Sequence, residues 1–217
     1  MRSITPKRKK MNYLYCYKMT WDTEFAPNPH YGVLTLATCK PTIRRCAKVG
    51  DWISGWTAVS VYDKNHRPCS FRDAQRLIYL AKITDKITYA EYWKNYPEKK
   101  PHEISSGASV SKRGCGAPVN SCNKSYDSGD NIYEPVKNGF HQHENAGNHG
   151  KDDKEHDLKG KFVLICKEFY YFGVHNTQKI EKDIFPYPVP RCKKISVEDG
   201  KDFIQYIQNN YSQGINK

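Results

Sequence analysis

Apolar and polar residues alternate along several short segments of this chain, and such alternation is typical of β-strands with one buried face. In residues 12–19, three tyrosines and a methionine fall on one side. Further strands are predicted on similar grounds at 33–38, 52–56, 162–166 and 169–172. The run 77–83 is apolar almost throughout, which predicts a central strand that is buried on both faces.

Two helices are predicted from capping signals. Thr88 and Glu91 have the spacing of a capping box and open a short aromatic helix. Ser196 and Asp199 are expected to cap a final helix whose apolar residues share one face. The basic segment 43–48 is expected to form one helical turn. Loops are expected at 20–32, 57–75 and 174–195, where Pro, Gly and polar residues gather.

This order of elements predicts one α+β domain, in which a curved, mostly antiparallel mixed sheet is flanked by two helices. The domain is expected to cover residues 11–211, between a disordered basic leader at 1–10 and a tail at 212–217. Apolar residues become scarce from 98 to 160, so this segment is expected to be a long polar loop or insert. Whether translation starts at Met1 or Met11 is open.

The balance of charge is strongly basic. The chain holds 35 Lys and Arg against 23 Asp and Glu, a net charge of +12. The leader contributes five of the basic residues and no acidic one, so the rest retains +7. This charge favours an anionic partner, nucleic acid or nucleotide, although basic surfaces also arise for solubility alone. No stretch approaches ~18 apolar residues, so no membrane partner is expected. The sequence leaves protein partners open.

The eight cysteines are spread along the chain, and none forms a Cys-x-x-Cys pair. The basic leader also lacks the apolar stretch of a secretory signal. The cysteines are therefore expected to be reduced thiols in a cytoplasmic protein. As an alternative, Cys115 and Cys122 lie in a Gly- and Ser-rich stretch and could pair or bind a metal.

The turn Gly50-Asp51 leads into a strand that carries two indoles, Trp52 and Trp56. Glycine supplies an unusual backbone angle, aspartate caps the turn, and an indole offers a flat face to a planar ligand. These residues are therefore candidates for a ligand site. The simpler interpretation is a tight turn into a core strand whose tryptophans fill the interior.

The loop at residues 18–29 follows the first strand and is dense in hydroxyl, carboxylate and aromatic groups. Such loops commonly place binding groups on a rigid scaffold. Asp22 and Asn28 could read the donor edges of a base, with Thr20 beside them and an aromatic residue stacked on it. The alternative is that Asp22 forms a local turn and the aromatic residues plug the end of the sheet.

Two more places carry candidate binding groups. Arg44 lies in the densest basic patch and could clamp a phosphate, or it belongs to a solvated basic turn. A second turn, Gly129-Asp130, is followed by Asn131 and Tyr133. This turn places an acid and an amide where they could hydrogen-bond a ligand.

Metal and cofactor signals are weak. His141, His143 and His149 lie among aspartates in the polar insert, and imidazole and carboxylate are ligands for zinc, iron or manganese. Their spacing matches no metal signature, so no cofactor is predicted and a divalent metal stays an alternative. The chain lacks Gly-x-Gly-x-x-Gly, a Walker loop, Gly-x-Ser-x-Gly and His-Glu-x-x-His. These absences exclude dinucleotide dehydrogenases, P-loop kinases and serine hydrolases of the familiar kinds.

A set of motifs along the chain resembles one known family. They are Lys18-Met19-Thr20-x-Asp22-Thr23, Phe25-Ala26-Pro27-Asn28-Pro29, Gly32-x-Leu34-Thr35-Leu36-Ala37-Thr38-Cys39-Lys40-Pro41-x-Ile43-Arg44, Gly50-Asp51-Trp52-Ile53-x-Gly55-Trp56, Leu77-Ile78-Tyr79-Leu80, Gly129-Asp130-Asn131-Ile132-Tyr133 and Phe162-Val163-Leu164-Ile165 to Phe169-Tyr170-Tyr171-Phe172-Gly173. As a set, over roughly residues 12–207, they resemble the second of the nucleotide-modification-associated domains of bacteria and their phages. A weaker similarity in fold to PUA-like and EVE-like domains leaves open whether the sheet closes into a barrel.

The resemblance implies an association with systems that modify bases in nucleic acid. It carries over as candidate site residues Asp22, Asn28, Arg44, Asp51, Asp130 and Asn131, and it matches His149 ahead of Asp157-Leu158. The chain departs from the pattern at Glu24, where the family has glycine. It also departs at 105–125, where the insert is longer and richer in cysteine.

Three functions are compatible with these residues. The first is a module that recognises a modified base, stacked on Trp21, Trp52 or Trp56. The second is an enzyme that makes, transfers or removes a base modification. In that case the candidate catalytic acids or bases are Asp22, Asp51 and Asp130. A third interpretation is a non-catalytic protein-interaction domain in a phage or defence locus.

Overall fold

The computed structural model describes residues 11–72, 75–104, 125–147 and 149–216. The strands are β1 (Tyr13–Asp22), β2 (Leu34–Leu36), β3 (Trp52–Asp63), β4 (Pro68–Ser70), β5 (Leu77–Lys82), β6 (Asp85–Thr88), β7 (Glu103–Ile104), β8 (Ser125–Tyr126), β9 (Tyr133–Val136), β10 (Gly139–Gln142), β11 (Phe162–Cys166), β12 (Glu168–Tyr171), β13 (Cys192–Ser196) and β14 (Gly214–Ile215). The helices are α1 (Pro41–Cys46), α2 (Tyr89–Asn95), α3 (Lys151–Leu158), α4 (Lys201–Asn210) and the 3₁₀ turn η1 (Pro97–Lys99).

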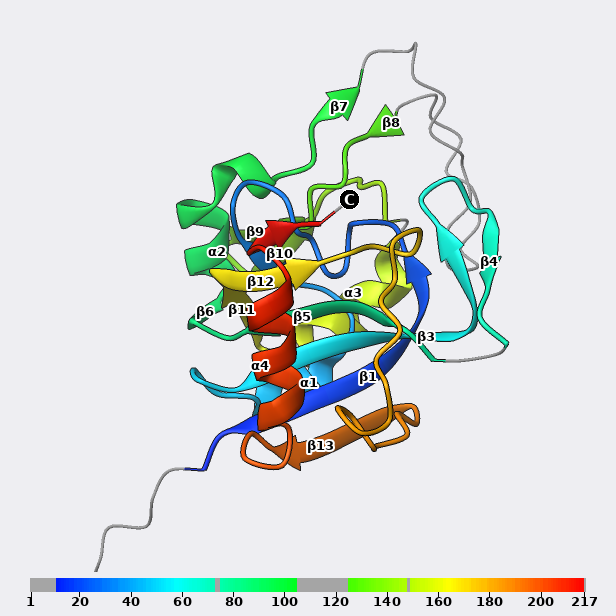
Figure 1. Cartoon of the computed structure of the whole chain (residues 1–217). Coiled ribbons are helices and arrows are strands. Elements are labelled where there is room, and N and C mark those ends of the chain that lie inside the picture. Colours follow the sequence, from blue (N-terminus) through cyan, green and yellow to red (C-terminus); the bar gives the residue numbers. More distant parts are fainter. Residues whose placement is uncertain (1–10, 73–74, 105–124, 148, 217) are drawn as a thin grey trace, which may run out of the picture.

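A seven-stranded mixed sheet forms the centre of the domain (Figure 1). Its order is β13-β1-β3-β5-β12-β14, with β4 paired to β3. Two of the pairs, β1 with β3 and β12 with β14, are parallel, and the other pairs are antiparallel. The strand order is open, and no barrel closes among the described residues. The α+β prediction is therefore confirmed, whereas the barrel suggested by PUA-like domains is not formed.

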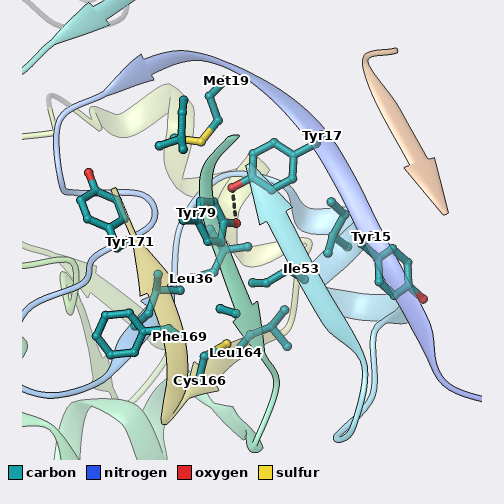
Figure 2. Packing of buried hydrophobic residues seen from close by; sticks show 14 of the residues in the cluster. Tyr15, Tyr17, Met19, Leu36, Ile53, Tyr79, Leu164, Cys166, Phe169 and Tyr171 are labelled. Atoms are coloured by element: carbon teal, nitrogen blue, oxygen red, sulfur yellow. Dashed lines mark hydrogen bonds between the residues drawn. The ribbon is translucent and has the colours of Figure 1, made fainter. Parts of the chain in front are cut away.

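Side chains of β1 alternate between two cores, because successive residues of a strand point to opposite faces. Tyr15, Tyr17 and Met19 lie in one core with residues of β5, β11 and β12 (Figure 2). The hydroxyls of Tyr17 and Tyr79 form a buried hydrogen bond of 2.7 Å within this core. The face predicted for the first strand is therefore the buried one.

On the opposite face, α4 crosses the sheet and covers the second core (Figure 1). Trp52 and Trp56 lie in this core, and the ring of Trp56 stacks on Phe185 with centroids 4.9 Å apart. The structure therefore agrees with the simpler interpretation, in which these two tryptophans fill the interior. Position 55, between these tryptophans in the sequence, requires glycine. A Cβ there would be 2.3 Å from the Met19 sulfur and 2.4 Å from the Tyr79 ring.

A second sheet, β2-β11-β6, packs behind the first and supports α2 and the turn at Gly129-Asp130. The predicted capping box is present at α2. Thr88 Oγ1 accepts a hydrogen bond from the Glu91 amide at 3.2 Å, and the Glu91 carboxylate accepts one from the Thr88 amide at 2.7 Å. This cap fixes where the aromatic helix begins and which face it turns to the core.

Three local expectations differ from the structure. Strand β3 continues through part of the expected loop at 57–75 and pairs with β4, and its side chains there alternate between buried and exposed positions. An edge strand, β13, forms within and just beyond the expected loop at 174–195. Ser196 and Asp199 close a turn rather than a helix cap, and α4 begins only at Lys201.

The described part of the segment expected as a polar insert, 98–160, is more ordered than predicted. It contains η1, the hairpin β9–β10 and helix α3. Helix α3 has little apolar content, so hydrophobic periodicity could not reveal it. Cys115 and Cys122 lie outside the described residues. No helix among the described residues is long and apolar enough to cross a membrane.

Candidate functional site

A cavity of about 410 Å³ opens at the end of β1, and we call it the Cys39 cavity. Its wall is formed by residues 17–21, 23–26, 39–40, 64–66, 126, 128, 146–147 and 149. Lys18, Lys40 and Lys64 contribute cationic side chains to this wall, Glu24 contributes a carboxylate, and Trp21 and Phe25 are aromatic. The lining therefore combines positive charge with flat apolar surfaces.

Cys39 follows strand β2 and precedes helix α1. It has a φ of 55°, and the next residue, Lys40, has a φ of 41°. Non-glycine residues rarely occupy this left-handed region, and pairs of them store conformational strain that is typical of functional sites. The Cys39 carbonyl is held by the Nε of Arg44 at 2.7 Å. The unusual backbone therefore places the Cys39 thiol at the cavity wall.

His149 bridges the thiol and a buried carboxylate. Its Nε2 lies 3.5 Å from Cys39 Sγ, and its Nδ1 lies 2.7 Å from Oδ2 of Asp157. The imidazole also packs on Phe25, with ring centroids 5.1 Å apart. Burial opposes protonation of His149, but its hydrogen bonds to Asp157 and Cys39 outweigh burial and raise its pKa to about 10.

Asp157 projects from the last turn of α3 and has no exposed surface. Its Oδ1 accepts a hydrogen bond of 2.6 Å from the Cys39 amide. Its Oδ2 accepts from the Tyr133 hydroxyl at 2.8 Å as well as from His149. Burial would raise the pKa of Asp157, yet these hydrogen bonds hold it below its ordinary value. Asp157 is therefore a carboxylate that orients His149.

The guanidinium of Arg44 connects the loop of Cys39 to the end of helix α3. It is fully buried, and Nη2 donates to the Asp157 carbonyl at 2.6 Å while Nη1 donates to the Phe162 carbonyl at 3.0 Å. The Tyr89 hydroxyl also accepts from Nη1. Its guanidinium is thus engaged inside the protein, and it acts as a structural support for the loop of Cys39.

The donor atoms of Cys39, His149 and Asp157 lie within 4.8 Å of one another, so these three residues could together hold a metal ion. Sulfur, imidazole and carboxylate suit zinc or a similar transition metal. However, a carboxylate has about four lone-pair positions, and Asp157 already uses three of them within the protein. The arrangement fits a hydrogen-bonded chain of groups better than a coordination sphere.

The other histidines predicted as weak metal candidates lie apart from this cluster. His143 stacks on Trp93 with centroids 4.9 Å apart, and its Nε2 contacts the Glu134 carboxylate at 2.9 Å. His141 packs edge-on against His143. Among the described residues, only His149 of the three histidines belongs to a group that could hold a metal.

Few of the predicted binding residues line the Cys39 cavity. Thr20 and Trp21 do, and Tyr133 contacts the site through Asp157. Asp22 ends β1 with its carboxylate bonded to the Tyr171 hydroxyl at 2.6 Å. It lies against a smaller cavity next to the first one.

Asp51 organises the turn before β3. Its two carboxylate oxygens accept from the backbone amides of Tyr13 at 2.9 Å and Lys48 at 2.8 Å. Gly50 has the positive φ of 93° that such a turn requires. The Asp51 carboxylate is therefore occupied by backbone amides. Asp51, Trp52 and Trp56 all lie outside the lining of the Cys39 cavity.

Asn28, Asp130 and Asn131 belong to a buried polar network around Lys99. The Lys99 ammonium donates to the Asn28 side chain at 2.7 Å and to the Val33 carbonyl at 2.8 Å. The hydroxyls of Tyr92 and Thr35 donate to Asp130, and the Asn131 amide donates to carbonyls at the end of α2. These groups hold the insert to the loop after β1.

Two residues of the cluster, Cys39 and Asp157, were not among the predicted site residues. Both stand within quoted motifs, Cys39 before Lys40-Pro41 and Asp157 eight residues after His149. The motifs contained the residues, but nothing in the sequence indicated that the chain brings 39 and 149 together. Contact across 110 residues depends on tertiary packing.

The sequence matches the family profile of the nucleotide modification associated domain 2 over residues 11–216. This match confirms the resemblance drawn from the motifs. No curated protein and no solved structure matches the chain.

Proposed function

Because the chain belongs to the nucleotide modification associated domain 2 family, we propose that its Cys39 cavity binds a nucleotide that carries a modified base. The observation that carries this proposal is the composition of the lining, in which cations and aromatic rings surround one volume. Its 410 Å³ falls in the range of about 300–1,000 Å³ typical of small-molecule sites. A single nucleotide fits such a volume.

The cations in the lining suit phosphate groups. Lys40 is half-buried, and its ammonium lies 4.6 Å from the centre of the Tyr17 ring. Burial lowers the pKa of Lys40, which means that its charge is poorly solvated and gains from an anionic ligand. Lys18 and Lys64 face the same volume from two other segments. A phosphate is therefore expected near these three ammonium groups.

Trp21 is the aromatic surface best placed for the base. It lines the cavity and is braced by Tyr62, whose ring is stacked on it at 4.5 Å. Stacking of a base on an aromatic residue contributes about 1–3 kcal/mol. A base held between the rings of Trp21 and Phe25 would present its substituent toward Cys39.

Binding would be measured with free nucleotides and with matched duplexes, modified and unmodified, across a salt series. A preference for the modified ligand that persists at high salt is expected, because a shaped cavity is less screened than surface charge. Trp21→Ala should raise the Kd for the modified nucleotide roughly 5- to 150-fold. Trp93→Ala removes an indole outside the cavity lining and should leave the Kd unchanged.

Three results would count against the proposal. Equal binding of both ligands that disappears with salt would mean a basic surface alone. Unchanged binding in Trp21→Ala would place the ligand elsewhere. Binding to no nucleotide would favour the third interpretation, a protein-interaction domain in a DNA-modification or phage-defence system.

A second candidate function is an enzyme that makes, transfers or removes the base modification. The specific observation that favours it is the chain of contacts from Cys39 through His149 to Asp157 at the cavity wall. Carboxylate catalysis by Asp51 or Asp130 is less well supported, because both are hydrogen-bonded outside the cavity lining. Asp22 remains a candidate through the smaller adjacent cavity.

A further inference from the structure

We propose that Cys39 is a catalytic nucleophile that removes an acyl group from the bound nucleotide, with His149 as the group that holds and returns its proton and Asp157 as the residue that orients His149. The identity of the substrate as a nucleotide rests on the proposed function, whereas the reactivity of Cys39 does not. The proposal rests on three side-chain groups that contact one another in turn: the Cys39 thiol, the His149 imidazole and the Asp157 carboxylate.

The order of contacts is the one that thiol and hydroxyl nucleophiles require. A base must reach the nucleophile with one ring nitrogen, while a third group holds the other. His149 Nε2 faces Cys39 Sγ at 3.5 Å, and Nδ1 faces Asp157 at 2.7 Å. The Tyr133 hydroxyl and the Cys39 amide fix Asp157 in turn. Both ends of the chain of contacts are therefore held in place.

Cys39 differs from the other described cysteines in combining access with a buried partner. Cys16 and Cys166 are fully buried in the cores. Cys69 has a related set of neighbours, since its sulfur lies 4.0 Å from His175 Nδ1 and His175 Nε2 lies 3.1 Å from Asp63.

In that second set, however, the contact to sulfur is longer, and the histidine side chain is 61% exposed against 7% for His149. Cys69 is therefore a natural internal control. It has the same residue types without the enclosure that makes a preorganised site.

The reaction is balanced with water as the only co-reactant. Sulfur attacks the acyl carbon as the thiolate of a pair in which His149 Nε2 already holds the thiol proton, and the carbonyl π-electrons move to oxygen. The oxygen electrons then return, the bond to the base amine or hydroxyl breaks, and His149 gives its proton to that leaving group. Water, deprotonated by His149, attacks the thioester, which releases a carboxylic acid and the free thiol.

The surroundings suit this class of substrate. Met19, Phe25 and Ala146 give the cavity an apolar side that can hold an acyl chain. Lys40 follows Cys39 in the chain and lines the same cavity, so it supplies a cation for a negative charge that develops on the acyl oxygen. The substrate class is thus a nucleotide with an amide or ester substituent on its base.

The test uses two probes that need no nucleotide. The full chain would be incubated with p-nitrophenyl acetate and quenched in acid, and the acetylated peptide would be found by mass spectrometry. In parallel, the rate of alkylation by iodoacetamide would be followed peptide by peptide. We expect an acetyl group on Cys39 and faster alkylation of Cys39 than of Cys69.

The variants separate chemistry from folding. Cys39→Ala should abolish the acetyl-enzyme and Cys69→Ala should not. His149→Gln keeps the size of the side chain and should slow acetylation roughly 100-fold or more, because a positioned proton-transfer group contributes about 10²–10⁴. A far-UV spectrum of each variant would show that the fold is retained.

Two outcomes would overturn the proposal. One is a Cys39 that reacts no faster than Cys69 or that reacts equally in His149→Gln. The other is stoichiometric zinc in the purified protein whose removal unmasks the thiol, since Cys39 would then be a metal ligand. Failure of the nucleotide site alone gives a different result, an acetyl-enzyme that forms normally in a protein without nucleotide affinity.

Discussion

At the scale of single residues, the candidate site depends on buried polar side chains whose partners lie far away in the sequence. Arg44 is the clearest case. The sequence suggested a phosphate clamp, but the guanidinium holds the carbonyls of Cys39 and Asp157 from within the protein. A buried arginine of this kind is fully satisfied by acceptors, so displacing it disturbs both residues that it contacts.

Gly160 provides a test of this support. A Cβ at Gly160 would lie 2.3 Å from Nη1 and 2.4 Å from Cζ of Arg44, so Gly160→Ala must displace the guanidinium. We expect the free energy of unfolding to fall by about 1–3 kcal/mol, as in other overpacked sites. Urea denaturation measures this change, and iodoacetamide reactivity of Cys39 should change with it.

The matched control is Gly150→Ala at the other end of α3. A Cβ there meets no atom within 4 Å, and its backbone is extended. This variant should lie within about 0.5 kcal/mol of the wild type, as expected for a surface change of this size. Equal losses in the two variants would show that the contact with Arg44 is not what matters.

At the scale of elements, helix α3 and the residues before it supply both His149 and Asp157. The segment is polar and looks like a loop in the sequence, yet it is anchored through these two side chains and through Gln142, which donates to the His149 carbonyl at 2.6 Å. The packing of α3 against the rest of the domain therefore depends on the charges of His149 and Asp157.

This coupling predicts a pH dependence. Burial opposes protonation of His149, but its partners raise its pKa from an ordinary 6.5 to about 10 in the folded protein. The stabilisation is fully present below pH 6.5 and is lost as the pH rises toward 10, because the unfolded histidine no longer binds the proton there. The free energy of unfolding of the wild type should therefore fall over this window.

The measurement is the difference between wild type and His149→Gln in urea denaturation from pH 6.5 to 10. The advantage of the wild type should shrink as the pH rises. Lys99, whose pKa burial lowers to about 8, acts in the opposite direction but equally in both proteins, so it cancels in the difference. A constant difference across this window would show that His149 is neutral in the fold.

At the scale of the whole molecule, an open mixed sheet with α4 on one face and a second sheet on the other leaves the end of β1 free to form a cavity wall (Figure 1). The polar network around Lys99 fastens the insert to this end. Its ammonium has no exposed surface, and its charge favours the ionised form of the buried Asp130 carboxylate, whose pKa burial raises.

Removal of this ammonium should therefore loosen the insert. In Lys99→Met the side chain keeps about the same volume but no longer donates to the Asn28 side chain and the Val33 carbonyl, and the positive charge near Asp130 is lost. We expect a loss of about 1–3 kcal/mol, as when a buried polar group loses its hydrogen-bond partner. Hydrogen exchange should rise first in 125–160. Uniform exchange over the whole chain would contradict a local anchoring role.

Much of the fold could be predicted from local signals. The strand at Tyr13–Asp22, the apolar central strand and the capped helix at Tyr89 each had a periodicity or cap that acts within a few residues. The site was less accessible to prediction. The sequence around Asp51 and Trp52 is equally compatible with a ligand site and with a turn that leads into a core strand. Asp157 gains its role only when α3 docks beside Cys39.

The central claim is that a modified nucleotide lies against Cys39. It is tested most directly by alkylating the protein with iodoacetamide, with and without saturating modified nucleotide, and comparing the rate at Cys39 with the rates at the exposed Cys46 and Cys192. We expect that the nucleotide slows alkylation of Cys39 strongly and leaves the other two unchanged. A nucleotide that binds and leaves all three rates unchanged would contradict it.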